Sequence, residues 1–136
     1  MSAPSPTDPD QVRQRCIENC LVTKSLCEQV LTTIATNADT NQRTVFEECA
    51  QLCGMSIDFM RRDSDLHPFI CFACTEACRR CAQECERRLE GGELLLRCGE
   101  ACRHSEMSCR AMSFKVRELA SEPLESTYSP PRPEEQ

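Results

Sequence analysis

Residues 71 to 85 carry five cysteines at steps of three and four residues, in the pattern CxxCxxxCxxCxxxC. They are Cys71, Cys74, Cys78, Cys81 and Cys85. Residues three or four positions apart lie on the same face of an α-helix, so the spacing predicts one helix with a strip of thiols along one face. Thiolates bind soft metal ions, and thiol pairs also carry disulfide chemistry.

Cysteines at similar spacing occur through the rest of the chain, which has 13 cysteines in 136 residues. The others are Cys16, Cys20, Cys27, Cys49, Cys53, Cys98, Cys102 and Cys109. A lone buried cysteine often acts only as a small apolar side chain. Packing alone does not explain so large a set, because Ala, Val or Leu would fill the same volume without the risk of oxidation.

A disulfide scaffold is disfavoured by the number and the spacing of the cysteines. Their number, 13, is odd. Helix neighbours such as Cys16 and Cys20 have Cβ atoms ~5–6 Å apart, whereas a disulfide needs them ~3.8 Å apart. The N-terminal residues lack the basic start and apolar stretch of a secretory signal. We therefore expect a cytoplasmic protein, in which thiols stay reduced.

Charge and hydropathy exclude several other functions. The net charge is −6, with neither a basic run nor an apolar run of membrane-spanning length, so we expect no nucleic-acid and no membrane partner. The sequence also shows no set of nucleophile, base and orienting residue, and we expect no enzymatic activity.

The periodicity of apolar residues and cysteines predicts four helices. They run from Asp10 to Thr36, from Asp39 or Thr40 to Arg62, from Pro68 to Gly91 and from Glu93 to Val116. Asp39 or Thr40 is expected to cap the second helix and Asp65 the third. Residues 1–9 are polar and residues 122–136 are rich in proline, so both are expected to be disordered, which leaves one domain at 10–121.

Long amphipathic helices joined by short connections predict an all-α fold, an antiparallel up-down-up-down four-helix bundle with a cysteine-lined core. Folding the first hairpin at its turn brings Cys27 near Cys49 and Cys53. Folding the second hairpin aligns the third helix with the fourth in five pairs: Cys85/Cys98, Cys81/Cys102, Cys78/Ser105, Cys74/Cys109 and Cys71/Met112. Leu31, Ile34 and Phe46 gather at one end, the sealed end. The opposite end, the mouth, collects the soft donors Cys16, Met60, Cys71 and Met112, with His67 beside them.

The thiol strips favour Cu(I) over other metals. Structural zinc sites need four ligands in a tetrahedron, usually presented on turns, and iron–sulfur motifs wrap a loop around the cluster. Cu(I) is soft, and neighbouring ions can share thiolates, so 13 thiolates would hold on the order of 13 ions. A monovalent ion for each thiolate also leaves the buried core nearly neutral.

The CxxxC pairs Cys16/Cys20, Cys49/Cys53, Cys74/Cys78, Cys81/Cys85 and Cys98/Cys102, spread over four predicted helices, resemble those of the bacterial copper storage proteins. The resemblance covers residues 12 to 116. It implies a four-helix bundle whose core holds many Cu(I) ions on thiolates, usually in a homotetramer. It also implies that cytosolic relatives have more thiols than this chain and histidines at the mouth, whereas exported relatives have methionines there.

Several further residues have predicted positions in the bundle. Ser105, Ile57 and Met112 occupy positions where a further thiol would fit. Met55, Met107 and His104 lie about 200° around the helix from the neighbouring cysteines, so they should face outward or toward another subunit. There are two alternative functions. One is a thiol redox or electron-transfer protein that cycles interhelical disulfides at Cys85/Cys98 and Cys81/Cys102. The other is a small copper sensor or chaperone.

Overall fold

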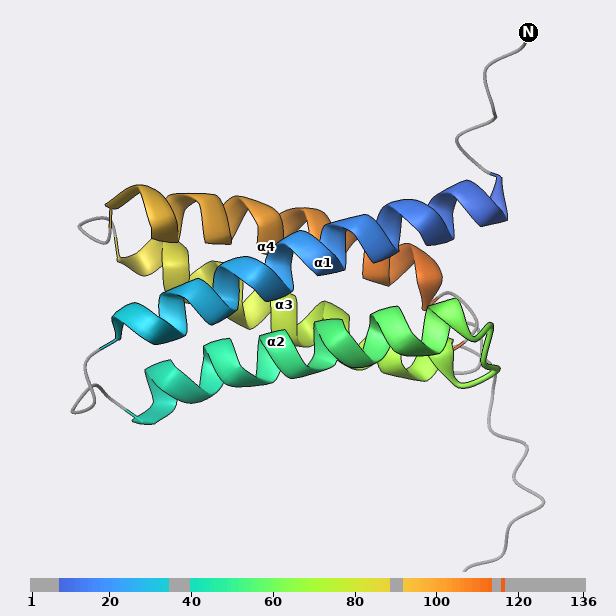
Figure 1. The fold of residues 1–136 in the computed structure, drawn as a ribbon, viewed down its shortest axis with the longest axis horizontal. Coiled ribbons are helices and arrows are strands. Elements are labelled where there is room, and N and C mark those ends of the chain that lie inside the picture. Colours follow the sequence, from blue (N-terminus) through green and yellow to red (C-terminus); the bar gives the residue numbers. More distant parts are fainter. Residues whose placement is uncertain (1–7, 35–39, 89–91, 114–115, 117–136) are drawn as a thin grey trace, which may run out of the picture.

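The computed structural model describes residues 8–34, 40–88, 92–113 and 116, and in those ranges it contains four helices and no strand. The helices are α1 (Pro9–Thr33), α2 (Thr40–Arg61), α3 (His67–Arg87) and α4 (Gly92–Met112). They lie side by side with alternating direction, which confirms the predicted antiparallel bundle (Figure 1). Residues 1–7 and 117–136, which include most of the segments predicted to be disordered, lie outside the described ranges.

The four helices form a square in cross-section. Helix α1 packs against α2 and α4, and α3 packs against the same two neighbours, whereas the diagonal pairs make no close backbone approach in the described part of the chain. Side chains from all four helices therefore point toward one axis. No helix in the described ranges is long and apolar enough to cross a membrane.

Helix α1 begins one residue before the predicted start because Asp8 caps it. The Asp8 Oδ1 atom accepts a hydrogen bond from the Asp10 backbone N–H at 3.0 Å, and Pro9 occupies the first turn. Proline suits that position because its missing N–H would have no partner there. The helix ends at Thr33, earlier than the predicted Thr36, since Ile34 already has extended backbone angles.

The turn between α2 and α3 is a Schellman motif with Asp63 in the left-handed conformation, at φ 51°. The backbone N–H groups of Ser64 and Asp63 donate to the carbonyls of Phe59 and Met60, as that motif requires. The prediction that Asp65 caps α3 is wrong. The residue before α3 is Leu66, and it is the Ser64 hydroxyl that accepts the Leu66 N–H at 3.1 Å. Pro68 lies in the first turn, as predicted.

The other predicted helix ends differ little from the structure. Helix α3 ends at Arg87, and the predicted extension to Gly91 falls on residues 89–91, outside the described ranges. Gly92 starts α4 with φ 77°, a left-handed angle that glycine adopts without steric cost. Helix α4 ends at Met112 rather than at Val116, whose N–H donates to the Ser113 carbonyl.

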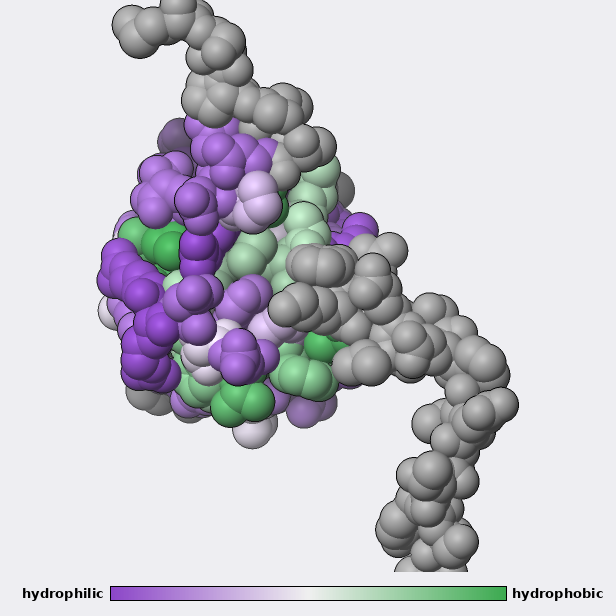
Figure 2. All heavy atoms as spheres, turned by 90° about the vertical axis from the view of Figure 1, so that its right-hand side faces the viewer, coloured by the Kyte–Doolittle hydropathy of each residue, from purple (hydrophilic) through white to green (hydrophobic). Residues whose placement is uncertain are grey.

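The sealed end of the bundle is hydrocarbon, as predicted. The Phe46 side chain is fully buried, and Leu31, Ile34, Val45 and Leu94 pack against the buried core while remaining partly exposed. Figure 2 views the opposite end, the mouth, where hydrophilic side chains form much of the rim. Of the 23 buried hydrophobic residues in the described part of the core, 13 are cysteines and two are methionines.

The charged residues between the cysteines form ion pairs on the outside of the bundle. Arg103 of α4 binds both carboxylate oxygens of Glu86 on α3, at 2.6 and 2.9 Å. It also binds Glu106, which is mostly buried and contacts Arg110 as well. The Arg103–Glu86 pair therefore links α3 to α4.

Candidate metal centre

All 13 cysteines lie in the bundle core as free thiols. Twelve have no exposed surface, and Cys85 is 5% exposed. Each of the four helices contributes, because the three- and four-residue spacing turns every cysteine toward the bundle axis. The predicted cysteine-lined core is confirmed.

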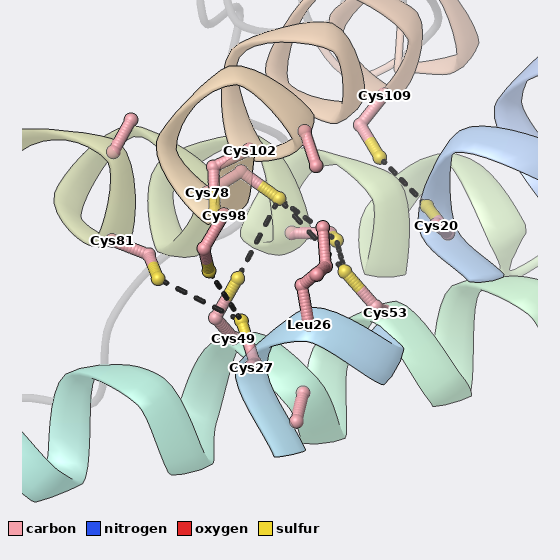
Figure 3. Close-up of a cluster of buried hydrophobic side chains, with 14 of the residues drawn as sticks. Cys20, Leu26, Cys27, Cys49, Cys53, Cys78, Cys81, Cys98, Cys102 and Cys109 are labelled. Carbon is pink, nitrogen blue, oxygen red and sulfur yellow. Dashed lines mark hydrogen bonds between the residues drawn. The ribbon is translucent and has the colours of Figure 1, made fainter. Parts of the chain in front are cut away.

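Neighbouring thiols are separated by 3.6 to 3.9 Å, measured between Sγ atoms. Cys109 of α4 lies 3.6 Å from both Cys16 and Cys20 of α1, and Cys27 lies 3.7 Å from Cys81 across the bundle diagonal. Figure 3 shows Cys27 directed toward Cys81 and Cys98, and Cys20 directed toward Cys109. Further contacts of 3.7 to 3.9 Å join Cys53/Cys74, Cys53/Cys78, Cys74/Cys78 and Cys49/Cys78.

Eleven of the 13 thiols, all except Cys71 and Cys85, form four groups, and within each group the sulfur atoms lie within 4.8 Å of one another. One group has four members, and the others have three. The groups are Cys27/Cys81/Cys98/Cys102, Cys16/Cys20/Cys109, Cys20/Cys53/Cys74 and Cys49/Cys53/Cys78.

The three-membered groups are not separate sites, because Cys20 belongs to two of them and so does Cys53. Shared thiols suit metal ions that accept bridging thiolates, as Cu(I) does. The four-membered group also meets the ligand count of tetrahedral zinc, for which Zn–S bonds of ~2.3 Å place sulfur atoms ~3.8 Å apart. One zinc ion would use only that group, whereas bridged Cu(I) uses the whole network.

The predicted alignment of α3 with α4 is confirmed for Cys81 and Cys102, whose sulfur atoms lie in one group. The pairings Cys85/Cys98, Cys74/Cys109, Cys78/Ser105 and Cys71/Met112 stay predictions, and so does the approach of Cys27 to Cys49. Cys53 shares a group with Cys20 and Cys74.

Sequence reasoning missed a buried hydroxyl pair in the middle of the core. The Thr23 hydroxyl lies 2.7 Å from the Ser105 hydroxyl and donates to the Ala101 carbonyl at 2.9 Å. Neither residue has exposed surface. Thr23 stands between Cys20 and Cys27 on the α1 stripe, and Ser105 stands between Cys102 and Cys109 on α4. The pair therefore interrupts the thiols on the α1–α4 side.

Burial among other thiols keeps protons on several cysteines. Hydrogen bonding with Cys20, and then with other thiols, raises the pKa of Cys53 well above its ordinary value, and burial raises it further. The pKa of Cys109 is raised in the same way, first by Cys16. Because the charged form is disfavoured in a buried site, these thiols are neutral at pH 7 when no metal is bound.

The residues predicted for the mouth lie at one end of the bundle, where α1 and α3 begin and α2 and α4 end (Figure 1). Cys16, Cys71 and Met60 are fully or almost fully buried, and Met112 is 8% exposed. His67 is partly buried at the first position of α3. Met55, Met107 and His104 are exposed on the surface, as predicted.

Sequence reasoning also missed Gly99, which is buried against Cys85. A Cβ atom built at Gly99 would lie 3.1 Å from the Cys85 Cβ, closer than ordinary van der Waals contact. A glycine inside a helix costs stability, so an isolated one in a helical pattern often marks close packing. That signal was available in the sequence.

Known proteins similar to this chain include copper storage proteins. A family model described as copper storage protein matches residues 9–114, and no curated protein matches the chain. A solved structure from Nitrosospira multiformis is 28% identical, with a TM-score of 0.70 and coverage of 78% of this chain and 98% of that chain.

Two of the similar structures from Streptomyces lividans hold copper. A cytosolic copper storage protein with five coppers is 27% identical, with a TM-score of 0.67 and coverage of 76% of this chain and 93% of that one. A copper storage protein loaded with 10 copper equivalents is 25% identical, with a TM-score of 0.69 and coverage of 84% and 92%. Since the family model matches most of its length, this chain belongs to the copper storage protein family.

Proposed function

We propose that this protein stores Cu(I) in the cytoplasm, with many ions held on each chain by the thiolates of its 13 cysteines. The observation that carries this proposal is the network of buried thiols, in which neighbouring sulfur atoms from different helices approach within 3.6 to 3.9 Å. Related structures from Streptomyces lividans contain five coppers and 10 copper equivalents.

The charge of the filled core favours Cu(I) over divalent ions. Every thiol must lose its proton to bind metal, which adds one negative charge for each ligand. One monovalent ion for each thiolate cancels that charge. Divalent ions would neutralise the core at one ion for every two thiolates, which is half the number of Cu(I) ions. A tetrahedral zinc site instead uses four thiolates for one ion and leaves two negative charges in a buried site.

Two alternative functions fit the geometry less well. A sensor or chaperone for one or a few ions needs an accessible thiol pair, and 12 of the 13 thiols have no exposed surface. A disulfide-cycling protein would have to move sulfur atoms that are 3.6 Å or more apart to the bonding distance of about 2.05 Å within a packed core.

Further ligands are proposed at the mouth. Met60 and Met112 continue the cysteine stripes of α2 and α4, and both are mostly buried at the same end as Cys16 and Cys71. Thioethers are soft donors that suit Cu(I). His67, at the start of α3, would add an imidazole. The cytoplasmic location is supported by the Streptomyces lividans relative, which is described as cytosolic.

An anaerobic titration of the reduced protein with Cu(I) tests the proposed function. A strong chromophoric chelator competes for the metal, and the number of ions bound to each chain is read at saturation. We expect on the order of ten or more ions, because bridging thiolates bind about one ion each. Saturation at one or two ions would instead support a sensor, chaperone or redox role.

A parallel titration with Zn²⁺ provides a matched comparison on the same protein. Only Cys27, Cys81, Cys98 and Cys102 offer four thiols at tetrahedral spacing, so we expect about one zinc ion per chain. The variant Cys27→Ser should lose that zinc ion and retain most of the Cu(I). Equal capacities for the two metals would contradict the argument from bridging.

We further propose that the protein forms a homotetramer, as the family resemblance implies. Several large apolar side chains are exposed on the bundle, among them Phe69 and Phe72, which lie three residues apart on one face of α3. An exposed apolar face of this kind favours association. Light scattering after size exclusion should give four times the chain mass of 15.4 kDa, and a mass equal to one chain would contradict the proposal.

A further inference from the structure

The outward face of α4 carries a second pattern, separate from the cysteines that face the core. Leu96 and Met107 lie on this face. They are 64% and 68% exposed, more than any other large apolar side chain in the described part of the chain. About three helical turns separate the two residues, so they lie on the same side of α4, one near each end.

Charged residues continue this outward face at heptad spacing. One seam position of the heptad holds Glu93, Glu100 and Met107, and the other holds Leu96, Arg103 and Arg110. Arg103 and Arg110 both bind Glu106 of the same helix, yet 38% and 49% of their side chains stay exposed. Glu93 and Glu100 are exposed as well. The face therefore presents both signs of charge around two apolar side chains.

This seam is complementary to itself when a second α4 lies antiparallel to the first. In an antiparallel pair, each residue at one seam position faces a residue at the other position of the partner. Leu96 then faces the partner's Met107, Glu93 faces the partner's Arg110, and Glu100 faces the partner's Arg103. One two-fold axis, which crosses α4 between Ala101 and Cys102, relates all three pairs.

The same charges disfavour a parallel arrangement of the two helices. Parallel helices would place each seam residue against its own copy, so Glu93, Glu100 and Arg103 would each face a like charge. Repulsion of this kind specifies orientation as much as the favourable pairs do. The exposed Phe69 and Phe72 of α3 offer no such symmetry, because both lie near the start of their helix.

Two hollows beside α4 are placed to receive the partner's apolar side chains. One, of about 720 Å³, lies between α3 and α4, with Leu96 and Gly99 in its wall. The other, of about 430 Å³, lies between α1 and α4 and is lined in part by Val12, Met107 and Ala111. The antiparallel arrangement brings the partner's Met107 to the first hollow and the partner's Leu96 to the second. Projecting side chains that enter hollows give an interface its shape complementarity.

We propose that two copies of this chain associate through their α4 helices, antiparallel about a two-fold axis, with Leu96 packed against the partner's Met107. A tetramer with three perpendicular two-fold axes needs two kinds of contact between its subunits, and this is one of them. In that respect the inference rests on the proposed homotetramer. It involves no core thiol, so it is independent of the copper content.

The variant Leu96→Glu tests the contact through the mass measured by light scattering after size exclusion. Because Leu96 is exposed, the bundle itself should fold as before, which circular dichroism verifies. In the contact, the new carboxylate would be buried against the partner's Met107 without a partner of opposite charge. We expect association to weaken on the order of tenfold or more, so that the mass falls from four chains to two.

The matched control is Met55→Glu, which adds the same charge at an exposed apolar position of α2. Helix α2 lies diagonally opposite α4 in the bundle, so this variant should keep the mass of the parent protein. Loss of the tetramer in Met55→Glu but not in Leu96→Glu would overturn the proposal.

An exchange of charges tests the antiparallel orientation with residues that are exposed and leave the fold unchanged. Glu93→Arg and Arg110→Glu should each weaken association, because each places like charges together at both ends of the contact. The double variant Glu93→Arg/Arg110→Glu restores opposite charges and should restore the parent mass. The two positions are about 25 Å apart along one helix, so rescue cannot arise within a single chain. Dissociation of both single variants without rescue would overturn the antiparallel pairing.

The outcomes separate this contact from the other proposals. A parent mass of one chain would overturn both the homotetramer and the α4 contact. A parent tetramer that Leu96→Glu leaves intact would overturn the α4 contact alone. A capacity of one or two Cu(I) ions, together with dissociation in Leu96→Glu and rescue by the charge exchange, would support the contact and remove only the storage function.

Discussion

At the scale of single residues, the hydroxyl pair of Thr23 and Ser105 separates two regions of the thiol core. On the α1–α4 side, Cys16, Cys20 and Cys109 lie on one side of the pair. Cys27, Cys98 and Cys102 lie on the other side. Cys20 also belongs to a group with Cys53, and the Cys53 sulfur lies 3.9 Å from that of Cys78. Thr23 and Ser105 therefore limit how many ions the α1–α4 side can bridge.

Replacing both hydroxyls by thiols should increase the capacity for copper. The double variant Thr23→Cys/Ser105→Cys places two thiols at a buried site where the hydroxyls are 2.7 Å apart. We expect about one or two additional Cu(I) ions per chain, because two more bridging thiolates bind about that number. The measurement is the chelator-competed titration, with the parent protein alongside.

The matched control is Thr23→Val/Ser105→Ala, which removes the same hydroxyls without adding sulfur. Its capacity should equal that of the parent protein. The single variant Thr23→Val leaves the Ser105 hydroxyl and the Ala101 carbonyl without their buried partner and should cost about 1–3 kcal/mol of stability. An unchanged capacity in the thiol double variant would show that the pair does not limit bridging.

At the scale of the helices, the turn between α2 and α3 depends on the left-handed conformation of Asp63. Asp63 also accepts a hydrogen bond from Arg13 of α1 at 2.8 Å, so the turn is tied to the neighbouring helix. We expect Asp63→Ala to be less stable than Asp63→Gly by about 1 kcal/mol, because alanine is strained at positive φ and glycine is not. Both variants lose the carboxylate, so their difference isolates the backbone effect.

Thermal unfolding of the two apo variants, followed by circular dichroism, measures that difference. A higher midpoint for the alanine variant would contradict the assignment of the turn. Neither variant should change the Cu(I) capacity, since no cysteine lies in the turn.

At the scale of the whole molecule, the core should stay folded when it holds no metal. The raised pKa of Cys53 and Cys109 keeps their thiols neutral, and neutral thiols pack as small apolar groups. Phe46, Ile57 and Val30 add buried hydrocarbon. The helix signal in far-ultraviolet circular dichroism should therefore be nearly the same for the apo and copper-loaded protein, when both are kept anaerobic and reduced.

Copper should nevertheless raise the melting temperature, because a ligand that binds only the folded state stabilises it. Proteins whose metal site creates the fold lose their structure when the metal is removed. Loss of most of the helix signal on removal of copper would place this protein among them and would contradict a preformed core.

The sequence by itself determined the number and type of the helices and the thiols that face the core. The cysteines recur at three- and four-residue steps, and that spacing selects one helix face whatever the partner helices are. Short connections then allow little besides an antiparallel bundle. The thiol pair Cys81/Cys102 followed from folding a hairpin at its turn.

Only the tertiary structure decided which thiols share a group and where the core meets solvent. Contacts across the diagonal, such as that between Cys27 and Cys81, depend on the relative heights of helices that are not consecutive in the chain. The pairing of Thr23 with Ser105 joins α1 to α4 and has the same cause. Exposure of Cys85 beside Gly99 depends on how closely α3 and α4 pack, which no pattern within one helix determines.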